Sequence, residues 1–206
     1  MYIAVAGNIG AGKSTLVKLL SKAYALQPVY EAVDENPYLE DFYQDMPSYA
    51  FKSQIFFLAK RLEQHLGQVN NGDRLIQDRT IYEDAAIFAQ NLFDEGLMDE
   101  RDFASYKRMY EAIRLALRPP DLLIYVQASV ETLKARIALR GRDYEQAIAE
   151  TYLKRLNVLY ERFIAGYDSS DVLIVSADQT DFIHNPADLP RLKNRLEQFG
   201  LVPPIL

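Results

Sequence analysis

Residues 7–15 have the composition and spacing of a phosphate-binding loop. Two glycines with four residues between them precede a lysine and a serine, which is the order found in P-loops. The glycines let successive N–H groups turn inward around phosphate oxygens, Lys13 supplies a mobile positive charge, and the Ser14 hydroxyl can ligate Mg²⁺. The predicted phosphate-binding residues are Gly7, Asn8, Ile9, Gly10, Ala11, Gly12, Lys13, Ser14 and Thr15.

The sequence on either side of this loop fits the same interpretation. Residues 2–6 form a short apolar run typical of a buried strand, and apolar residues recur at helical spacing after the loop. The positive N-terminus of that helix would face the bound anion. The motif therefore predicts binding of a nucleoside triphosphate and leaves open which reaction follows.

Two carboxylates that follow predicted strands are candidates for chemistry. Glu31 ends the apolar run 28–31, and Asp78 follows the run 75–77. In open α/β sheets, ligands lie beyond the carboxyl ends of the strands, and a carboxylate there in a P-loop protein commonly organises Mg²⁺. Asp78 could instead cap a helix that begins within two residues, although the P-loop favours the metal role.

Polar residues border the apolar stripes of two predicted helices. Gln54 and Arg61 lie seven residues apart on one line of the first helix, and Asp84 borders the stripe of the next helix in the same way. Polar groups at the margin of a core need partners. Arg61 and Asp84 would satisfy each other, whereas Gln54 offers both a donor and an acceptor. The alternative is that these are boundary residues that reach solvent.

An arginine cluster marks a third candidate region. Arg136 and Arg140 share a helix face, where like charges repel, and Gly141 supplies a hinge before Arg142. A mobile lid over about residues 139–147 that closes over a triphosphate would use these charges to stabilise phosphoryl transfer. A solvated basic face is the alternative.

These residues must be positioned by short apolar runs that alternate with longer stretches of helical period. Such alternation is typical of an α/β fold with a parallel sheet. We expect one domain over residues 1–206, with a five-stranded parallel sheet flanked by helices. The expected strands are 2–6, 28–31, 75–77, 122–126 and 172–175, and the expected helices lie near 13–25, 48–68, 80–93, 99–117, 130–139, 145–166 and 186–198.

Composition argues against several other classes of protein. The formal net charge of −6 argues against a nucleic-acid polymer as partner, because such binding needs a broad basic surface. The chain has no cysteine, which rules out disulfides, thiolate chemistry and Cys-based zinc sites. The sequence shows no signal peptide and no apolar run of transmembrane length, so we expect a cytoplasmic protein with no membrane partner.

Taken together, the motifs resemble the deoxynucleoside kinase family along most of the chain. Those that occur in the family's order are the P-loop, Glu31, the Gln54 to Arg61 spacing, Asp78-Arg79 with Asp84, and the arginine-rich lid. The sequences of residues 35–38 and 78–84 look most like those of the bacterial deoxyadenosine and deoxyguanosine kinases. The resemblance implies a P-loop kinase fold and a homodimer that uses ATP and Mg²⁺ to phosphorylate the 5′-hydroxyl of a purine deoxynucleoside.

The resemblance also implies a role for each matching residue. Glu31 would be the general base near the 5′-hydroxyl with Arg79 beside it, and Ser14 and Asp78 would organise Mg²⁺. Many relatives have glutamate where this chain has Asp78, so the shorter side chain could bind the metal through water. Tyr43 and Glu145 would bind the sugar 3′-hydroxyl, and Gln54, Arg61 and Asp84 would bind the base edge. Lys13, Arg136, Arg140 and Arg142 would bind the triphosphate. Asp178 and Gln179 would lie near the adenine of ATP.

Two other functions remain open on the sequence. A nucleoside monophosphate kinase of the thymidylate kinase type also uses a P-loop, an Asp-Arg pair and an arginine lid. Its acceptor carries a phosphate, which the carboxylate of Glu31 would repel. A non-catalytic ATP-binding switch is the other alternative, and it would need no nucleoside pocket. The sequence does not say which purine deoxynucleoside is preferred, because the Gln54 amide can flip to suit either edge.

Overall fold

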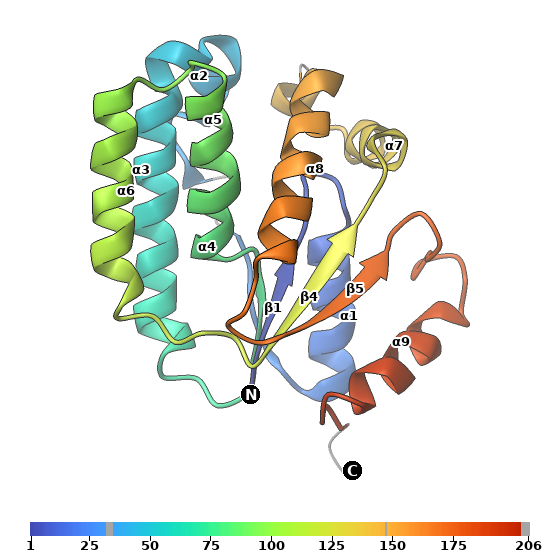
Figure 1. Ribbon diagram of the computed structural model, residues 1–206. Helices are drawn as coiled ribbons and strands as arrows, with labels where there is room; N and C mark the ends of the chain where they lie inside the picture. Colours follow the sequence, from blue (N-terminus) through green and yellow to red (C-terminus); the bar gives the residue numbers. More distant parts are fainter. Residues whose placement is uncertain (32–34, 147, 203–206) are drawn as a thin grey trace.

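Five parallel strands form one sheet at the centre of the computed structural model, which describes residues 1–31, 35–146 and 148–202 (Figure 1). Their order across the sheet is β2-β3-β1-β4-β5. The predicted α/β fold class with a five-stranded parallel sheet is confirmed. The strands are β1 (Tyr2–Ala6), β2 (Gln27–Val29), β3 (Leu75–Asp78), β4 (Leu122–Gln127) and β5 (Asp171–Ser176).

Helices cover both faces of this sheet, with α1 and α8 on opposite sides of it (Figure 1). The described helices are α1 (Lys13–Tyr24), α2 (Leu39–Gln44), α3 (Met46–Gln64), α4 (Ile81–Glu83), α5 (Gln90–Asp94), α6 (Glu100–Arg114), α7 (Val130–Arg140), α8 (Glu150–Ala165) and α9 (Asp188–Glu197). Three described stretches of other helical types are η2 (His65–Val69), η3 (Asp84–Ala89) and η4 (Asp143–Glu145). Within the described residues, no helix combines the length and the apolar character needed to cross a membrane.

The central strand β1 separates two apolar cores. Ile3 and Val5 face the core that α1, α7 and α9 cover, whereas Tyr2 and Ala4 face the core that α8 covers. All of β1 is buried, as expected for a parallel strand with helices on both faces of its sheet. The phosphate-binding loop therefore begins at the end of a fully buried central strand.

A separate helical layer stands beside the sheet. It contains α3, α6 and the helical stretch formed by α4, η3 and α5 (Figure 1). Its apolar core includes Leu58, Ile81, Leu92 and Tyr106. Because this layer stands next to the carboxyl ends of β2 and β3, polar residues on its inner margin lie close to the residues that follow those strands.

Several element boundaries differ from the sequence expectation near the site. The second strand ends at Val29, where its pairing with Gln77 stops, so Glu31 lies in the connection beyond it. The expected helix over 80–93 contains the π-helical turn η3, and α8 begins only at Glu150. The sequence analysis did not expect α2. Residue 147, the end of the predicted lid, lies outside the described residues.

Candidate active site

A cavity of about 260 Å³ opens at the carboxyl ends of the strands. The phosphate-binding loop, the ends of β2 and β3, the helical layer and the predicted lid all contribute to its wall. The structure therefore brings together residues that are far apart in the sequence. The predicted site residues that line the cavity are Ile9, Gly10, Lys13, Ser14, Glu31, Tyr43, Gln54, Asp78, Arg79, Asp84, Arg140, Arg142 and Glu145.

The phosphate-binding loop needs its glycines for space and for backbone conformation. Gly10 and Gly12 have φ of 82° and 99°, in the left-handed region that side chains disfavour. A Cβ on Gly7 would lie 2.7 Å from the carbonyl oxygen of Val126. Asn8 anchors the loop to α8, because its Nδ2 donates to the carbonyl of Leu153 at 3.0 Å.

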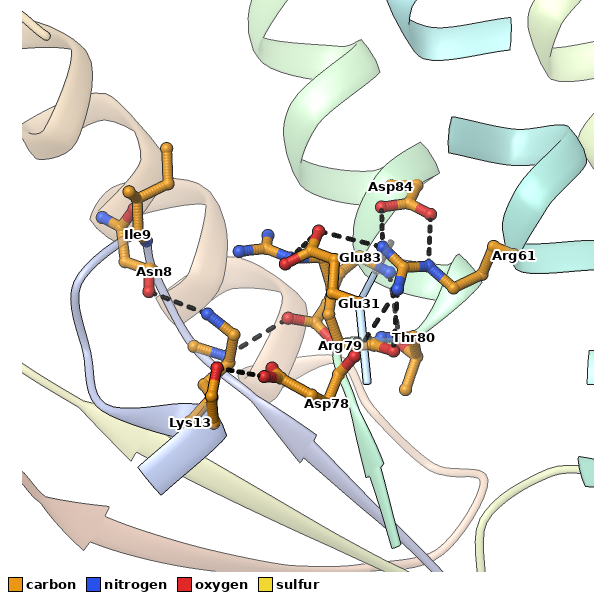
Figure 2. A network of polar contacts seen from close by, with 12 residues as sticks. Asn8, Ile9, Lys13, Glu31, Arg61, Asp78, Arg79, Thr80, Glu83 and Asp84 are labelled. Atoms are coloured by element: carbon orange, nitrogen blue, oxygen red, sulfur yellow. Dashed lines mark hydrogen bonds and ion pairs between the residues drawn. The ribbon is translucent and has the colours of Figure 1, made fainter. Parts of the chain in front are cut away.

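Lys13 begins α1 and is almost fully buried beneath this loop. Its Nζ donates to the carbonyl oxygen of Asn8 at 3.1 Å (Figure 2). Burial is the largest influence and, with the positive charge of Arg79, lowers the pKa of Lys13 to about 8, against the opposing effect of Asp78 and Glu31. A bound polyphosphate would supply a negative counter-charge beside this ammonium group.

Ser14 and Asp78 form the candidate metal site. The Ser14 hydroxyl donates to Asp78 Oδ2 at 2.5 Å, while Asp78 Oδ1 is buried without a hydrogen-bond partner among the described residues. An unpartnered carboxylate oxygen beside a hydroxyl suits a hard cation such as Mg²⁺. The described residues contain no cluster of three or more metal-binding side chains, so phosphate and water oxygens would have to complete the coordination.

Glu31 lies between two arginines in front of the phosphate-binding loop (Figure 2). Its Oε1 is 2.8 Å from Arg79 Nε and 3.1 Å from Arg61 Nη2. Burial alone would raise the pKa of this carboxyl, but Arg79, Arg61 and Lys13 together lower it to about 2. Glu31 is therefore an anion at neutral pH and shares the cavity with Lys13.

Arg79 occupies an unusual backbone conformation directly after β3. Its φ is 64°, which few residues other than glycine adopt and which commonly marks a functional position. Its guanidinium carbon lies 4.3 Å from the centre of the Phe88 ring, a cation–π contact. From this position Arg79 Nε also lies 2.8 Å from Glu31 Oε1.

The predicted pairing of Arg61 with Asp84 is present. Arg61 Nε donates to Asp84 Oδ2 at 2.9 Å, and Arg61 Nη2 donates to Oδ1 at 3.3 Å (Figure 2). Gln54 is buried nearby, and its Oε1 has no hydrogen-bond partner among the described residues. A polar ligand atom in the cavity could satisfy this amide. The expectation that polar margin residues find partners, rather than solvent, thus holds for Arg61 and Asp84.

The predicted lid is held by its own carboxylate. Glu145 is buried and accepts from Arg140 Nε at 2.9 Å and from Arg142 Nη1 at 3.5 Å. Tyr43 stacks on Tyr144 with ring centres 5.9 Å apart, so α2 and η4 meet at the cavity mouth. A triphosphate that drew these arginines inward would have to compete with Glu145. Helical periodicity does not predict a contact of this kind.

Two predicted residues, Arg136 and Asp178, already have main-chain partners away from the cavity centre. Arg136 donates to the carbonyl of Ala11 at 2.6 Å and to that of Ala177 at 3.0 Å, which fixes α7 against the phosphate-binding loop. Asp178 accepts from the main chain of Ser129 at 3.1 Å. Neither Asp178 nor Gln179 is among the described residues that line the cavity, and their contact with adenine stays a prediction.

The sequence analysis did not assign a role to Glu83 or Tyr160, which lie directly behind Arg79. Glu83 accepts from the Thr80 main chain at 2.8 Å and from Gly7 N at 3.2 Å, and the Tyr160 hydroxyl receives Arg79 Nη1 at 3.2 Å. The spacing from Thr80 to Glu83 is a capping-box signature that could have identified the carboxylate as structured. No comparable sequence signal marks Tyr160, whose contacts come from packing of α8.

Together, the parallel sheet, the phosphate-binding loop and the arginine-bearing segment define a P-loop kinase fold. The deoxynucleoside kinase family matches residues 3–200 of the chain. This chain therefore belongs to the deoxynucleoside kinase family, and it is a kinase.

Kinases of similar length resemble this chain over most of its sequence. The chain is 35% identical over 196 residues to the deoxyadenosine/deoxycytidine kinase of Bacillus subtilis, covering 94% of this chain and 90% of the relative. It is 37% identical over 217 residues to the deoxyguanosine kinase of Lactobacillus acidophilus, covering 98% and 93%. The solved structure of deoxyadenosine kinase from M. mycoides with bound dATP matches with a TM-score of 0.84 at 35% identity, covering 96% of this chain and all of that one.

Proposed function

We propose that this enzyme transfers the γ-phosphoryl group of ATP to the 5′-hydroxyl of a purine deoxynucleoside, as a step of nucleotide salvage. The observation that carries the proposal is the position of Glu31, an ionised carboxylate held 2.8 Å from Arg79 in the cavity that also contains Lys13. A neutral hydroxyl acceptor must lose its proton during attack, and a carboxylate in hydrogen-bond reach can take it. The names of the similar kinases give deoxyadenosine, deoxyguanosine or deoxycytidine as their substrates, which supports this substrate class.

The transfer forms one bond to phosphorus and breaks another. The 5′-oxygen forms a bond to the γ-phosphorus, the bond from that phosphorus to the bridging oxygen of ADP breaks, and the hydroxyl proton passes to Glu31. The low pKa of Glu31, about 2, makes it a weak base. The proton therefore moves late, when bonding to phosphorus has made the attacking oxygen acidic, as expected for a loose transition state. Arg79 holds the carboxylate in place for this transfer.

Positive charge for the transferred group would come from the phosphate-binding loop and the lid. Lys13 and the loop amides bind the outer phosphates, and Arg140 and Arg142 lie on the cavity wall. Ser14 and Asp78 would hold Mg²⁺, since Asp78 Oδ1 is buried and unpartnered among the described residues. The metal supplies charge neutralisation and orientation of the phosphates when it is bound.

The nucleoside end of the cavity suits an uncharged purine. Gln54 and Asp84 line it together with the ring of Phe57, and Arg61 pairs with Asp84. We assign Gln54, Arg61 and Asp84 to the base edge, and Tyr43 and Glu145, which also line the cavity, to the sugar. Glu31 disfavours an acceptor that carries a phosphate, because the two negative charges would meet. The homodimer and the cytoplasmic location that the family resemblance and the sequence suggest remain predictions.

A steady-state panel tests this proposal. The full chain is assayed with ATP and Mg²⁺ against deoxyadenosine, deoxyguanosine, deoxycytidine and thymidine, and against deoxyadenosine monophosphate. We expect a higher kcat/KM for a purine deoxynucleoside than for the other acceptors. Preference for the monophosphate would instead indicate a nucleoside monophosphate kinase. Tight ATP binding without deoxynucleoside-dependent release of ADP would indicate a non-catalytic switch.

Arg61→Ala should impair nucleoside recognition far more than ATP recognition. The substitution leaves Asp84 buried without its partner and removes one of the two arginines that contact Glu31. Breaking a buried ion pair by removing one partner costs about 3–5 kcal/mol. We expect kcat/KM for the deoxynucleoside to fall about a hundredfold while the KM for ATP changes less than about threefold.

The matched control is Lys60→Ala, which removes the neighbouring, partly exposed cation of α3 and its surface ion pairs with Glu35 and Glu63. This variant should retain both Michaelis constants, because exposed ion pairs contribute little. Circular dichroism and unfolding midpoints measured alongside the kinetics show whether the Arg61 variant is folded. Equal losses for nucleoside and ATP in a folded variant would contradict the assignment of Arg61 to the base.

The pH dependence of ATP use should report Lys13. Since burial lowers the pKa of Lys13 to about 8, the free enzyme loses this positive charge as the pH rises through that value. We expect kcat/KM for ATP to fall above this pH by about tenfold per unit. In kcat the limb should move to higher pH, because bound phosphates favour the charged ammonium. A flat kcat/KM profile up to pH 10 would contradict the role of Lys13.

A further inference from the structure

Glu83 is a buried carboxyl group that the proposed mechanism does not use. It lies at the end of α4 with no exposed surface and joins three parts of the fold. Its Oε2 accepts from the main-chain N–H of Thr80 at 2.8 Å and from the Thr80 hydroxyl at 3.1 Å. Its Oε1 lies 3.2 Å from Gly7 N in the phosphate-binding loop and 2.9 Å from the Tyr160 hydroxyl on α8. Figure 2 shows it beside Arg79, behind Glu31.

The Tyr160 hydroxyl has more acceptors around it than it has protons. Its oxygen lies 2.8 Å from the carbonyl oxygen of Gly7 and 2.9 Å from Glu83 Oε1. It also accepts a hydrogen bond from Arg79 Nη1 at 3.2 Å. A phenol has one proton to donate and two lone pairs that accept. With an ionised Glu83, one of the two short oxygen–oxygen contacts would have no hydrogen between its atoms.

A proton on Glu83 Oε1 resolves this conflict. Glu83 then donates to Tyr160, Tyr160 donates to the carbonyl oxygen of Gly7, and Arg79 donates to the second lone pair of the phenol. Oε1 keeps a lone pair that accepts from Gly7 N, so each of these hydrogen bonds has one donor and one acceptor. Oε2 keeps its bonds from Thr80, because those use lone pairs only.

The charges of the cavity floor also balance without Glu83. Three cations and three carboxylates lie next to one another there, so an ionised Glu83 would add a fourth buried negative charge. The groups that balance are Lys13, Arg61 and Arg79 with Glu31, Asp78 and Asp84.

The groups that face Glu83 from the surrounding elements act in both directions. Burial is the largest influence and raises the pKa of Glu83, whereas the nearby cations lower it and do not reverse the shift. The facing cations are Arg79 and Lys13, and the facing phenols are Tyr2, Tyr125, Tyr160 and Tyr167.

We infer that Glu83 is a positioning residue that fixes the phosphate-binding loop and Arg79 relative to each other through Tyr160. It does so as a neutral acid whose proton is donated to the Tyr160 hydroxyl. Glu83 caps the helix that begins directly after Arg79, so it fixes the strained backbone of that residue through Thr80. It fixes the guanidinium through Tyr160. The inference rests on the proposed function, in which Arg79 holds Glu31 for proton transfer.

Four variants of the full chain test this inference by steady-state kinetics. Glu83→Ala and Tyr160→Phe should lower kcat, by about tenfold to a hundredfold for the former, because small misplacement of a catalytic group has effects of that size. The KM for the deoxynucleoside should change less than about threefold in both. Glu83→Gln, which keeps a neutral donor and an acceptor, should stay within about fivefold of the wild-type kcat. The control Tyr125→Phe removes a neighbouring phenol that contacts Glu161 and should leave kcat unchanged.

A second measurement does not depend on activity. A neutral Glu83 in the folded state has a pKa above its unfolded value of about 4.5. Its favourable contribution to the free energy of unfolding is therefore complete below that pH and is lost as the pH rises through the raised folded pKa. Glu83→Gln removes this dependence. The unfolding free energy of Glu83→Gln should therefore increase relative to wild type with rising pH across that window, and a pH-independent difference would overturn the neutral acid.

The outcomes separate the two proposals. A wild-type enzyme that does not phosphorylate deoxynucleosides refutes the proposed function, while the unfolding data still decide the protonation state. Glu83→Gln as impaired as Glu83→Ala would overturn the neutral acid, and wild-type kcat in Tyr160→Phe would overturn the positioning role. If Glu83→Ala does not fold, Tyr160→Phe and Glu83→Gln decide the question.

Discussion

Replacing Glu31 with glutamine should lower kcat by at least about a hundredfold, as expected for loss of a general base. The amide keeps the size of the side chain and can still accept from Arg79, but it cannot take the 5′-hydroxyl proton. Nucleoside affinity, measured by calorimetry without ATP, should stay within about fivefold of the wild type, since Gln54, Arg61 and Asp84 are intact. A kcat loss without an affinity loss is the signature of an interaction made only in the transition state.

The control for this substitution is Glu35→Gln, which removes an exposed carboxylate from the same connection after β2. Its ion pair with Lys60 lies on the surface, so kcat should not change. The pH profile gives a further check. Because Arg79 and Arg61 lower the pKa of Glu31 to about 2, the wild-type kcat/KM should show no acidic limb from Glu31 between pH 5 and 7. A Glu31→Gln enzyme with near-normal turnover would remove Glu31 from the role of proton acceptor.

The sequence was sufficient to predict the architecture because the fold follows from local patterns. The apolar run 2–6 is β1, and the Gly-rich loop after it continues into α1, as the spacing of its apolar residues predicts. The margin positions of Arg61 and Asp84 predicted their pairing correctly, because a helical period determines which residues share a face. Each of these predictions starts from the spacing of residues within a single strand, loop or helix.

The parts that the sequence could not predict depend on contacts between distant segments. β2 ends at Val29, which pairs with Gln77, although β3 continues to Asp78. Glu31 then reaches Arg79 and Arg61 from a loop. The π-helical turn η3 keeps Asp84 and Phe88 on the cavity wall, and no periodicity marks its extra residue. One missed contact is local: Glu145, which was expected at the sugar, also pairs with Arg140 only five residues before it, across the turn that follows α7.

Lys13→Met should lower kcat/KM for ATP by about a hundredfold to a thousandfold, in the range observed when one preorganised charge stabiliser is removed. Methionine has a similar length and no charge, so the substitution changes electrostatics more than packing. The control is Lys18→Met, an exposed lysine on the same helix α1, which should have wild-type kinetics.

The same Lys13 variant should fold at least as stably as the wild type. The lowered pKa of Lys13, about 8, shows that burial disfavours its charged form in the folded protein more than the nearby carboxylates favour it. At pH 7 the wild type therefore retains a destabilising charge, and replacing it with an apolar side chain relieves that cost. Chemical unfolding at pH 7 measures this directly. Lower stability in Lys13→Met would mean that the ammonium contributes to folding through Asn8 and Asp78, whereas an inactive but stable variant would show that the charge serves the phosphates of the substrate at the expense of the fold.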